Sequence, residues 1–595
     1  MASSSEAGTP VRTLFGRIEV PQALRALVRA RESGLVTLAA LIGVIAGLVV
    51  AGMAFGAALM HHLLFGVPLS ERLSSQTVIN PMSALIVPML GGVVFGIALW
   101  ILVRVRPGRE VDPIEANALH GGRMSLRGSL IVALQTVWSS GVGASVGLEA
   151  GYTQLASGIA SWIGQAFRLR RRDLRVLVGC GAAAAIAGAF GAPLAGAFYA
   201  FELVIASYSV ANLAPVGVAA LIGYLVASHL GETPLGIGSL YVSHVRGIDL
   251  AVSVLVGVMA AGVGITLMRC VALCESFLNW ARVRPVLRPT LGGLLVGAMA
   301  IATPEVLSSG HGAIQISAMY GQPLAMIALV FVLKSAASIV SLGTGFRGGL
   351  FFASLLIGAL GGRLFAELVT HFWPGSALDP HVYAIVGLGA LSVAVIGGPL
   401  TMTFIALETT GDFWLTTAVL IAIIVAAQVT RETFGYSFAT WRFHLRGEGI
   451  RSAADIGWIR ELTVRRMMRT DVRTVPAFTT VGRFRLVYPL GSTAQVIAVD
   501  EQKRYAGMVV VSEAHAPELE ENRPIRDILH FQDSMLLPTM TVKEAVILFD
   551  RSEAEALAVV EAPDNKEVVG LLTEAYALKR YSTELEQRRQ EILGE

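Results

Sequence analysis

Charged residues are scarce in this sequence of 595 residues. Only 15% of the residues are Asp, Glu, Lys or Arg, compared with about a quarter in soluble proteins. None of these four residue types occurs in the segments 33–70, 73–103, 128–148 and 203–231. A bilayer-spanning helix needs about 20 apolar residues, and each of these segments is long enough to form one. The pattern excludes a soluble protein with one large core and predicts a membrane protein with many spans.

Cysteine is also rare, and no cleavable signal peptide is visible. The three cysteines, Cys180, Cys270 and Cys274, lie in or beside apolar segments. Because their number is odd, a disulfide framework is not indicated. Five arginines precede the first apolar run: Arg12, Arg17, Arg25, Arg29 and Arg31. This positive charge predicts a cytoplasmic N-terminus, and we expect both termini on the cytoplasmic side of the plasma (inner) membrane.

Paired catalytic motifs such as His-Glu-x-x-His are absent, so the sequence does not indicate an enzyme. A cation carrier would need several carboxylates clustered in the membrane. Glu149, Glu202 and Glu408 are instead scattered along the chain. A cation transporter with a regulatory tail is therefore the weaker alternative to an anion transporter. The net charge of +3 gives no reason to expect a nucleic-acid partner.

The composition changes near residue 445. Beyond it, charge rises, and short apolar runs at 495–499, 506–511 and 556–560 alternate with helical patterns such as 542–551. This alternation is typical of a soluble α/β domain. The sequence predicts a cytoplasmic segment at 1–34, a transmembrane domain at 35–445, a linker at 446–460 and a cytoplasmic domain at 461–595.

The transmembrane part contains an internal repeat. Residues of a first block recur after a constant offset of 202, and residues of a second block after 206. The first block pairs Ser139, Gly141, Gly143, Gly147 and Leu148 with Ser341, Gly343, Gly345, Gly349 and Leu350. The second pairs Gly181, Gly191, Pro193, Leu194, Phe198, Ala200 and Glu202 with Gly387, Gly397, Pro399, Leu400, Phe404, Ala406 and Glu408. We predict two homologous halves, at about 35–240 and 250–443, that face opposite ways.

Glycine clusters at 141–151 and 343–349 mark where helices are expected to break. A broken helix exposes amide N–H groups that carry about half a positive charge. An anion satisfies these groups without any basic side chain. The alternative is that the glycines only allow close packing of helices.

Glu149 is the one acidic residue in the segment 128–167. A carboxylate at membrane depth is costly and usually functional. Beside exposed helix N-termini it is a tethered anion, which protonation would neutralise and release. We predict that Glu149 is a gate, a proton carrier or both; the alternative is a glutamate that caps a helix start.

At these residues the chain resembles the CLC family of chloride channels and chloride/proton antiporters. The segments that carry the resemblance are 147–151 (GLEAG), 181–196, 349–353 (GLFFA) and 435–437 (GYS). It implies an all-α membrane domain of two inverted repeats with broken helices, a homodimer with one pore in each subunit, and chloride as the permeant ion. The implied anion-binding residues are Gly147, Gly349, the amides of Leu350 and Phe351, and the hydroxyl of Tyr436. Taken alone, Tyr436 could equally be an interfacial anchor.

One departure from the family lies in an early motif, Gly-Ser-Gly-Ile-Pro, which supplies a serine hydroxyl to the anion. The corresponding segment here is 108–113 (GREVDP). Matching by the following Ile-Glu places Arg109 at the serine position, and matching by the proline places Glu110 there. Arg109 is therefore a candidate that attracts anions, and selectivity for chloride over other anions stays open.

A second departure concerns protons. Many antiporters of the family have an acid directly after the position of Glu202, where this chain has Leu203. Leucine cannot titrate, so the usual inner proton handoff is missing. This favours a passive chloride channel gated by Glu149, with chloride/proton exchange as the alternative.

The region from about 461 resembles a pair of CBS domains, with copies at 464–515 and 525–581. Such modules often sense adenine nucleotides. Tyr576 replaces the aspartate that binds ribose in the usual pattern. We therefore expect no resident cofactor and a structural or dimerising role, with adenine nucleotide binding as the alternative.

Overall fold

The computed structural model of this chain describes residues 32–105, 110–231, 245–314, 323–376, 378–438, 440–441, 462–580 and 582–583, with Pro21, Arg25 and Val28. The chain divides into two compact units, Met1–Asp455 and Ile456–Glu595. The segment predicted at 1–34 lies mostly outside the described residues, and the linker predicted at 446–460 lies wholly outside them. The domain boundaries drawn from composition therefore stay predictions.

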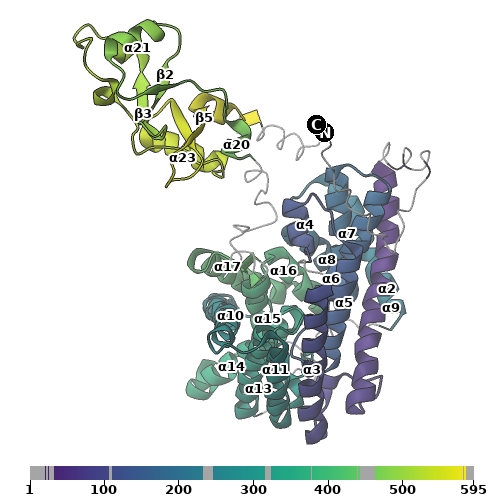
Figure 1. The fold of residues 1–595 in the computed structure, drawn as a ribbon. Helices are drawn as coiled ribbons and strands as arrows, with labels where there is room; N and C mark the ends of the chain where they lie inside the picture. Colours follow the sequence, from purple (N-terminus) through teal and green to yellow (C-terminus); the bar gives the residue numbers. More distant parts are fainter. Residues whose placement is uncertain are drawn as a thin grey trace. The chain divides into compact units, whose positions relative to one another are not determined.

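The first unit is built from helices (Figure 1). Within the described residues, nine helices are long and apolar enough to cross a membrane. The first half contains α2 (Glu32–Phe65), η1 (Leu73–Ser75), α3 (Pro81–Val105), α4 (Pro113–Leu119), α5 (Leu126–Gly141), α6 (Glu149–Ala166), α7 (Arg171–Phe190), α8 (Pro193–Tyr199), η2 (Ala200–Ile205) and α9 (Val210–His229). The second contains α10 (Gly247–Trp280), η3 (Pro285–Leu287), α11 (Arg288–Ala302), η4 (Pro304–Val306), α13 (Leu324–Gly343), α14 (Phe351–Phe372), η5 (Pro374–Ser376), α15 (Pro380–Ile396), α16 (Pro399–Thr410) and α17 (Phe413–Thr433). The prediction of a helical domain with many spans is confirmed.

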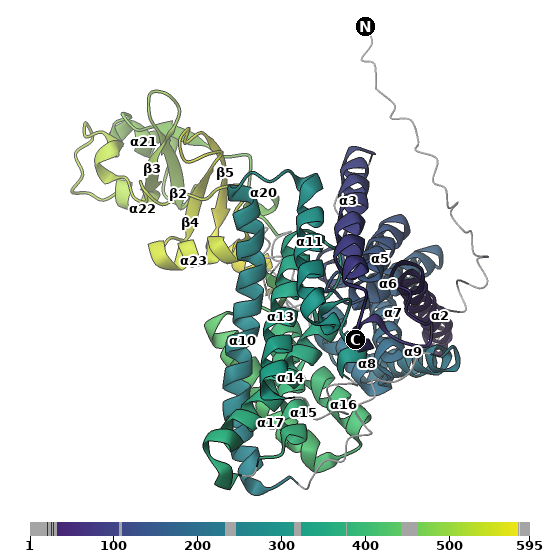
Figure 2. The ribbon, with the colours of Figure 1, turned by 90° about the horizontal axis from the view of Figure 1, so that it is seen from below.

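The helices of the two halves gather on opposite sides of this unit (Figure 2). Helices α3 and α11 pack closely against each other across the boundary. A side chain at Gly92 would collide with the Pro289 carbonyl, and one at Gly293 with the Pro88 carbonyl. Glycine at these two positions is therefore what lets the two helix backbones touch.

A pseudo-twofold axis relates the halves. The Ser145 amide donates to the Ser341 hydroxyl at 2.9 Å, and the Arg347 amide donates to the Ser139 hydroxyl at 3.0 Å. Ser145 corresponds to Arg347 in the repeat, and Ser139 corresponds to Ser341, each at an offset of 202 residues. The two hydrogen bonds are therefore the same contact, made once from each half. Reciprocal contacts of this kind are those that a twofold axis generates.

Glu202 and Glu408 form a second reciprocal pair. The Glu202 carboxylate of the first half accepts the Leu400 and Thr401 amides at the start of α16, both at 2.9 Å. The Glu408 carboxylate of the second half accepts the first-turn amides of α8 at 2.8 and 2.9 Å. Carboxylates are favourable at helix N-termini, where amides lack intrahelical partners. Each half thus caps a helix of the other.

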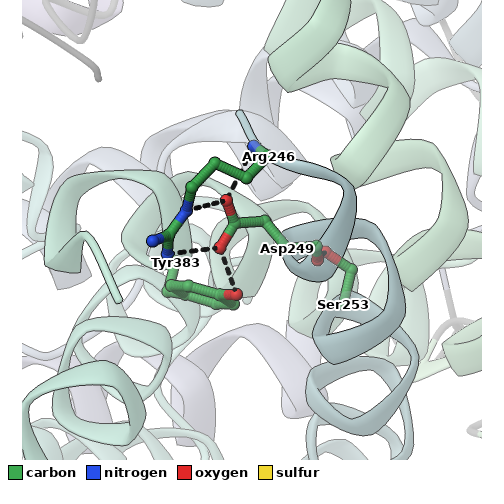
Figure 3. A network of polar contacts seen from close by, with 4 residues as sticks. All are labelled: Arg246, Asp249, Ser253 and Tyr383. Atoms are coloured by element: carbon green, nitrogen blue, oxygen red, sulfur yellow. Dashed lines mark hydrogen bonds and ion pairs between the residues drawn. The ribbon is translucent and has the colours of Figure 1, made fainter. Parts of the chain in front are cut away.

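A buried polar network ties α10 to α15 (Figure 3). The Tyr383 hydroxyl donates to Asp249 Oδ1 at 2.9 Å, and the Arg246 amide donates to Asp249 Oδ2 at 2.8 Å. The Ser253 hydroxyl donates to the Asp249 carbonyl at 2.7 Å. Buried carboxylates need such donors, because an unpaired charge in an apolar environment is costly. The network fixes the start of α10 against α15 within the second half.

The second unit is an α/β domain, as the sequence predicted. Its elements are α20 (Val464–Met467), β1 (Thr474–Pro476), α21 (Val481–Val487), β2 (Gln495–Val499), β3 (Tyr505–Val510), α22 (Val511–Ala514), η6 (Ile525–Ile528), α23 (Val542–Ser552), β4 (Ala556–Val560) and β5 (Val568–Thr573). Strand β2 pairs parallel with β1 and antiparallel with β3, while β4 pairs antiparallel with β5. In each copy a helix, α21 or α23, precedes an antiparallel strand pair.

The two copies of this unit exchange their leading segments. Val464 and Met467, at the start of the first predicted copy, are buried in the core that contains Phe549 of the second. Ile525, at the start of the second copy, is buried in the core that contains Phe484 of the first. The two copies consequently fold as one interlocked pair.

Candidate functional site at the junction of the two halves

The two glycine clusters meet on the pseudo-twofold axis. The Gly147 amide donates to the Gly349 carbonyl at 3.0 Å, and the Gly349 amide donates to the Gly147 carbonyl at 3.1 Å. This antiparallel bridge joins the two halves of the chain. It lies in the segment between two helices in each half. Helix α6 begins at Glu149 and α14 at Phe351, each two residues after the bridge. The predicted helix breaks are therefore at one place in the fold.

The Glu149 side chain crosses from the first half to the second. Its Oε1 accepts the Phe351 amide at 2.6 Å, at the first residue of α14, and the residue is only 4% exposed. Its Oε2 has no hydrogen-bond partner among the described residues. A side chain at Gly147 or Gly349 would run into this carboxylate. Glycine at both positions thus makes the space that Glu149 fills.

This geometry unites the two interpretations of Glu149. The carboxylate does cap a helix start, but the helix is α14 of the other half rather than its own α6. An N-terminal amide of a helix carries partial positive charge and favours an anion. The carboxylate therefore lies where a small free anion would be stabilised.

A cavity of about 360 Å³ adjoins this point. Glu149 lines it together with three of the predicted anion-binding residues, Gly349, Leu350 and Phe351. Its other charged lining residues are Glu110, Asp112 and Arg347. Gly147 is not among the lining residues of this cavity. Glu110 stands at one of the two alignments of the serine position, whereas Asp112 was not expected at the cavity.

Asp112 occupies the region where the family supplies its serine. Its carboxylate caps α4 by accepting the Glu115 amide at 2.9 Å, and Pro113 follows as the first helical residue. Asp before Pro is a favourable helix start, because the carboxylate pairs with a first-turn amide and proline has none to lose. Arg109 lies outside the described residues. Its role as an anion attractor stays a prediction.

Tyr436 lines a different cavity, of about 420 Å³, which Glu202 and Tyr208 also line. Its ring lies 5.6 Å from that of Trp441. Phe438, two residues later, lines the cavity that holds Glu149. The predicted contact between the Tyr436 hydroxyl and an anion beside Phe351 is therefore not supported by this placement.

Leu203 lines both cavities. It lies where many antiporters of the resembled family have an acid, and it places an apolar side chain between the two spaces. No proton can pass by titration of this residue.

The segment 143–147 (GASVG) also fits the pattern Gly-x-Ser-x-Gly found around serine nucleophiles. The Ser145 hydroxyl is fully buried and pairs with the Ser338 hydroxyl at 3.2 Å. A nucleophilic serine needs a neighbouring base. Ser145 is instead part of the contact between the halves.

Sequence reasoning missed Lys334. It is fully buried, although it carries a charge in the otherwise uncharged helix α13. That isolated charge was visible in the sequence and is a signal of the same kind as Glu149.

Comparison with known proteins agrees with this geometry. Residues 94–431 match the family model described as "Voltage gated chloride channel". The chain belongs to this family. It is 29% identical over 399 residues to the voltage-gated ClC-type chloride channel ClcB of Escherichia coli O157:H7 (strain EC4115 / EHEC), an alignment that covers 66% of this chain and 95% of the relative.

Two solved structures share the CLC fold. A slow cyanobacterial Cl⁻/H⁺ antiporter has a TM-score of 0.60 at 21% identity and covers 69% of this chain and 97% of its own. A eukaryotic CLC transporter has a TM-score of 0.58 at 19% identity and covers 93% of this chain and 98% of its own. The second match extends over most of the chain. The chain is thus an integral membrane CLC transport protein with an α/β C-terminal unit.

Proposed function

We propose that this CLC protein conducts chloride and similar small inorganic anions passively, and that Glu149 is the gate. The observation that carries the proposal is the bond from the Phe351 amide to Glu149 Oε1 at 2.6 Å. A tethered carboxylate there competes with a free anion for the start of α14. The relative ClcB is named a channel.

Protonation supplies a simple opening step. A neutral carboxyl group no longer has the charge that favours the helix N-terminus, so it leaves the Phe351 amide to the permeant anion. A partial charge from backbone amides suits conduction, because the anion must also leave again. Leu203 offers no titratable group between the cavities, which favours uncoupled flux.

Chloride/proton exchange is the second candidate, and one observation favours it. Glu110 and Asp112 line the same cavity as Glu149. A carboxyl group there could take over the proton handoff that Leu203 cannot perform. If the protein is an exchanger, the proton would pass between these acids and Glu149, and not past the Leu203 side chain that lines both cavities.

We also propose a homodimer, as the family resemblance implied, and cytoplasmic termini, as the charge distribution predicted. Helices α9 and α17 carry exposed apolar side chains that include Leu213, Leu221, Phe413 and Trp414. Large apolar surfaces on a membrane unit are covered either by lipid or by a second subunit. The arginines before the first span support a cytoplasmic N-terminus.

Proteoliposomes distinguish the two candidates. With an imposed chloride gradient, a clamped voltage and a pH dye inside, we expect chloride efflux without uphill proton movement. Uphill proton movement driven by chloride would overturn passive conduction. In that case Asp112→Asn should abolish proton movement if Asp112 carries the proton, while Asp173→Asn, an acid that does not line the cavity, should leave it intact.

A further inference from the structure

A groove of about 260 Å³ lies between four helices of the second half, α10, α13, α14 and α15. Every residue that lines it is apolar or glycine. The parts of α10 and α14 that line it belong to helices long and apolar enough to cross a membrane. Ions and ordered waters need polar partners, so an apolar hollow of this kind suits an apolar occupant.

Gly361 of α14 keeps the groove hollow. Gly358 and Gly362 on the same helix have a packing role, because a side chain at either would collide with a backbone carbonyl of α15. The nearest atoms to a Cβ at Gly361 would all belong to the Phe331 ring of α13, the closest at 3.1 Å. Gly361 is therefore not needed for the contact between α14 and α15, and its missing side chain leaves open space beside α13.

The groove runs along α14. Its lining residues on this helix extend from Ile357 to Val369, a length of about 18 Å at a rise of 1.5 Å per residue. Trp373, at the end of α14, is 74% exposed. An exposed tryptophan at the end of a span is typical of the membrane interface. The groove thus begins about 6 Å from that level and continues through about one leaflet of the hydrocarbon core, which is about 30 Å thick in all.

The rim of the groove faces lipid. Met259 of α10 and Leu368 of α14 line the groove and are 48% and 37% exposed. None of its lining residues belongs to α9 or α17, where we place the contact between subunits. A transmembrane helix is about 10 Å across, which is too wide for this space. A single hydrocarbon chain is narrow enough, and the bilayer supplies such chains at high concentration.

We propose that this groove binds one acyl chain of a phospholipid from the surrounding bilayer. Because lipid tails are themselves apolar, the gain comes from close packing and not from the hydrophobic effect. The chain completes the packing between α10 and α14, the helix whose first amide donates to Glu149. The proposal does not depend on Glu149 being the gate.

The experiment uses the full chain in proteoliposomes that contain a trace of phosphatidylethanolamine with a diazirine in the middle of one acyl chain. After irradiation, mass spectrometry locates the labelled residues. We expect severalfold more label on 357–369 than on Leu255 and Leu329, which are exposed but do not line the groove. Equal label on all exposed residues would mean that lipid only coats the surface, and would overturn the proposal. A groove covered by a second subunit would give no label on 357–369, with the same consequence.

Two variants fill the groove from different helices. Met259→Trp and Gly361→Leu should each lower the label on 357–369 about fivefold or more, because a close-fitting space does not accept added volume. Val258→Trp is the matched control, since Val258 is 45% exposed beside Met259 but does not line the groove. It should keep the wild-type label.

Unchanged label in Met259→Trp, or an equal loss in Val258→Trp, overturns the proposal. If Gly361→Leu does not fold, Met259→Trp decides alone. A diazirine fatty acid tested in the same way identifies the source of the chain. Label on 357–369 from the fatty acid, with none from the phospholipid, would assign the groove to a free fatty acid and would also overturn the proposal.

Discussion

Glu149→Gln is expected to raise chloride efflux at pH 7.5 by about tenfold or more and to make efflux nearly independent of pH. Glutamine has no charge to hold at the start of α14, so the variant imitates the protonated gate at every pH. A single titrating group changes its ionised-to-neutral ratio about tenfold per pH unit, which sets the scale of the effect. The wild type should therefore lose most of its efflux as the pH rises through the gate's titration.

The measurement is the initial rate of chloride release from proteoliposomes at a series of pH values. Glu71→Gln is a matched control, because Glu71 is exposed and does not line the Glu149 cavity. The control should follow the wild-type pH profile. If Glu149→Gln also follows it, Glu149 is not the gate.

Gly147→Ala in the Glu149→Gln background is expected to reduce chloride efflux about tenfold or more relative to Glu149→Gln alone. The new methyl group would lie well within contact distance of the position that Glu149 Oε2 occupies. Overpacking a close-fitting site costs about 1–3 kcal/mol. A cost of about 1.4 kcal/mol corresponds to a tenfold lower affinity for the anion. If the anion takes the place of the carboxylate, the methyl group must obstruct it even when the carboxylate is gone.

Gly52→Ala in the same background is the control for adding a methyl group. Nothing lies within 4 Å of the position that its Cβ would take. This double variant should release chloride as fast as Glu149→Gln. Undiminished efflux through Gly147→Ala/Glu149→Gln would mean that the anion does not pass Gly147.

The junction of the halves could be predicted because the repeat and the glycine clusters coincide. Gly147 and Gly349 are equivalent residues of the repeat, at an offset of 202. A residue that lies on a twofold axis must contact its own equivalent in the other half. Glu149 was recognisable as a lone carboxylate among glycines. Its acceptor, the Phe351 amide of the other half, followed only from the structure, because no sequence spacing gives the direction of a side chain.

Other parts of the site depend on geometry that the sequence does not contain. Glu202 and Glu408 are mates in the repeat, but their exchange of helix caps requires the halves to be placed together. The local backbone conformation determines whether the ring of Tyr436 or that of Phe438 lines the Glu149 cavity, and the ring that does so is Phe438. Gly435 has a φ of 83°, a conformation that redirects the chain just before them. A motif match at 435–437 could not reveal that redirection.

The C-terminal unit shows the same limit. Its alternation of strands and helices was clear from composition and periodicity. The exchange of leading segments was not, since Val464 and Ile525 each pack against residues far away in the sequence. Hydrophobic patterns identify which side chains are buried, and not which core they enter.

The most direct test of a shared position for gate and anion is the location of bromide in crystals of the Glu149→Ala variant. Bromide replaces chloride and is identified by its anomalous scattering. Passive conduction through this junction predicts a bromide peak within hydrogen-bonding distance of the Phe351 amide, where the wild type has Glu149 Oε1. Bromide bound elsewhere in the membrane unit, with none at the Phe351 amide, would contradict it.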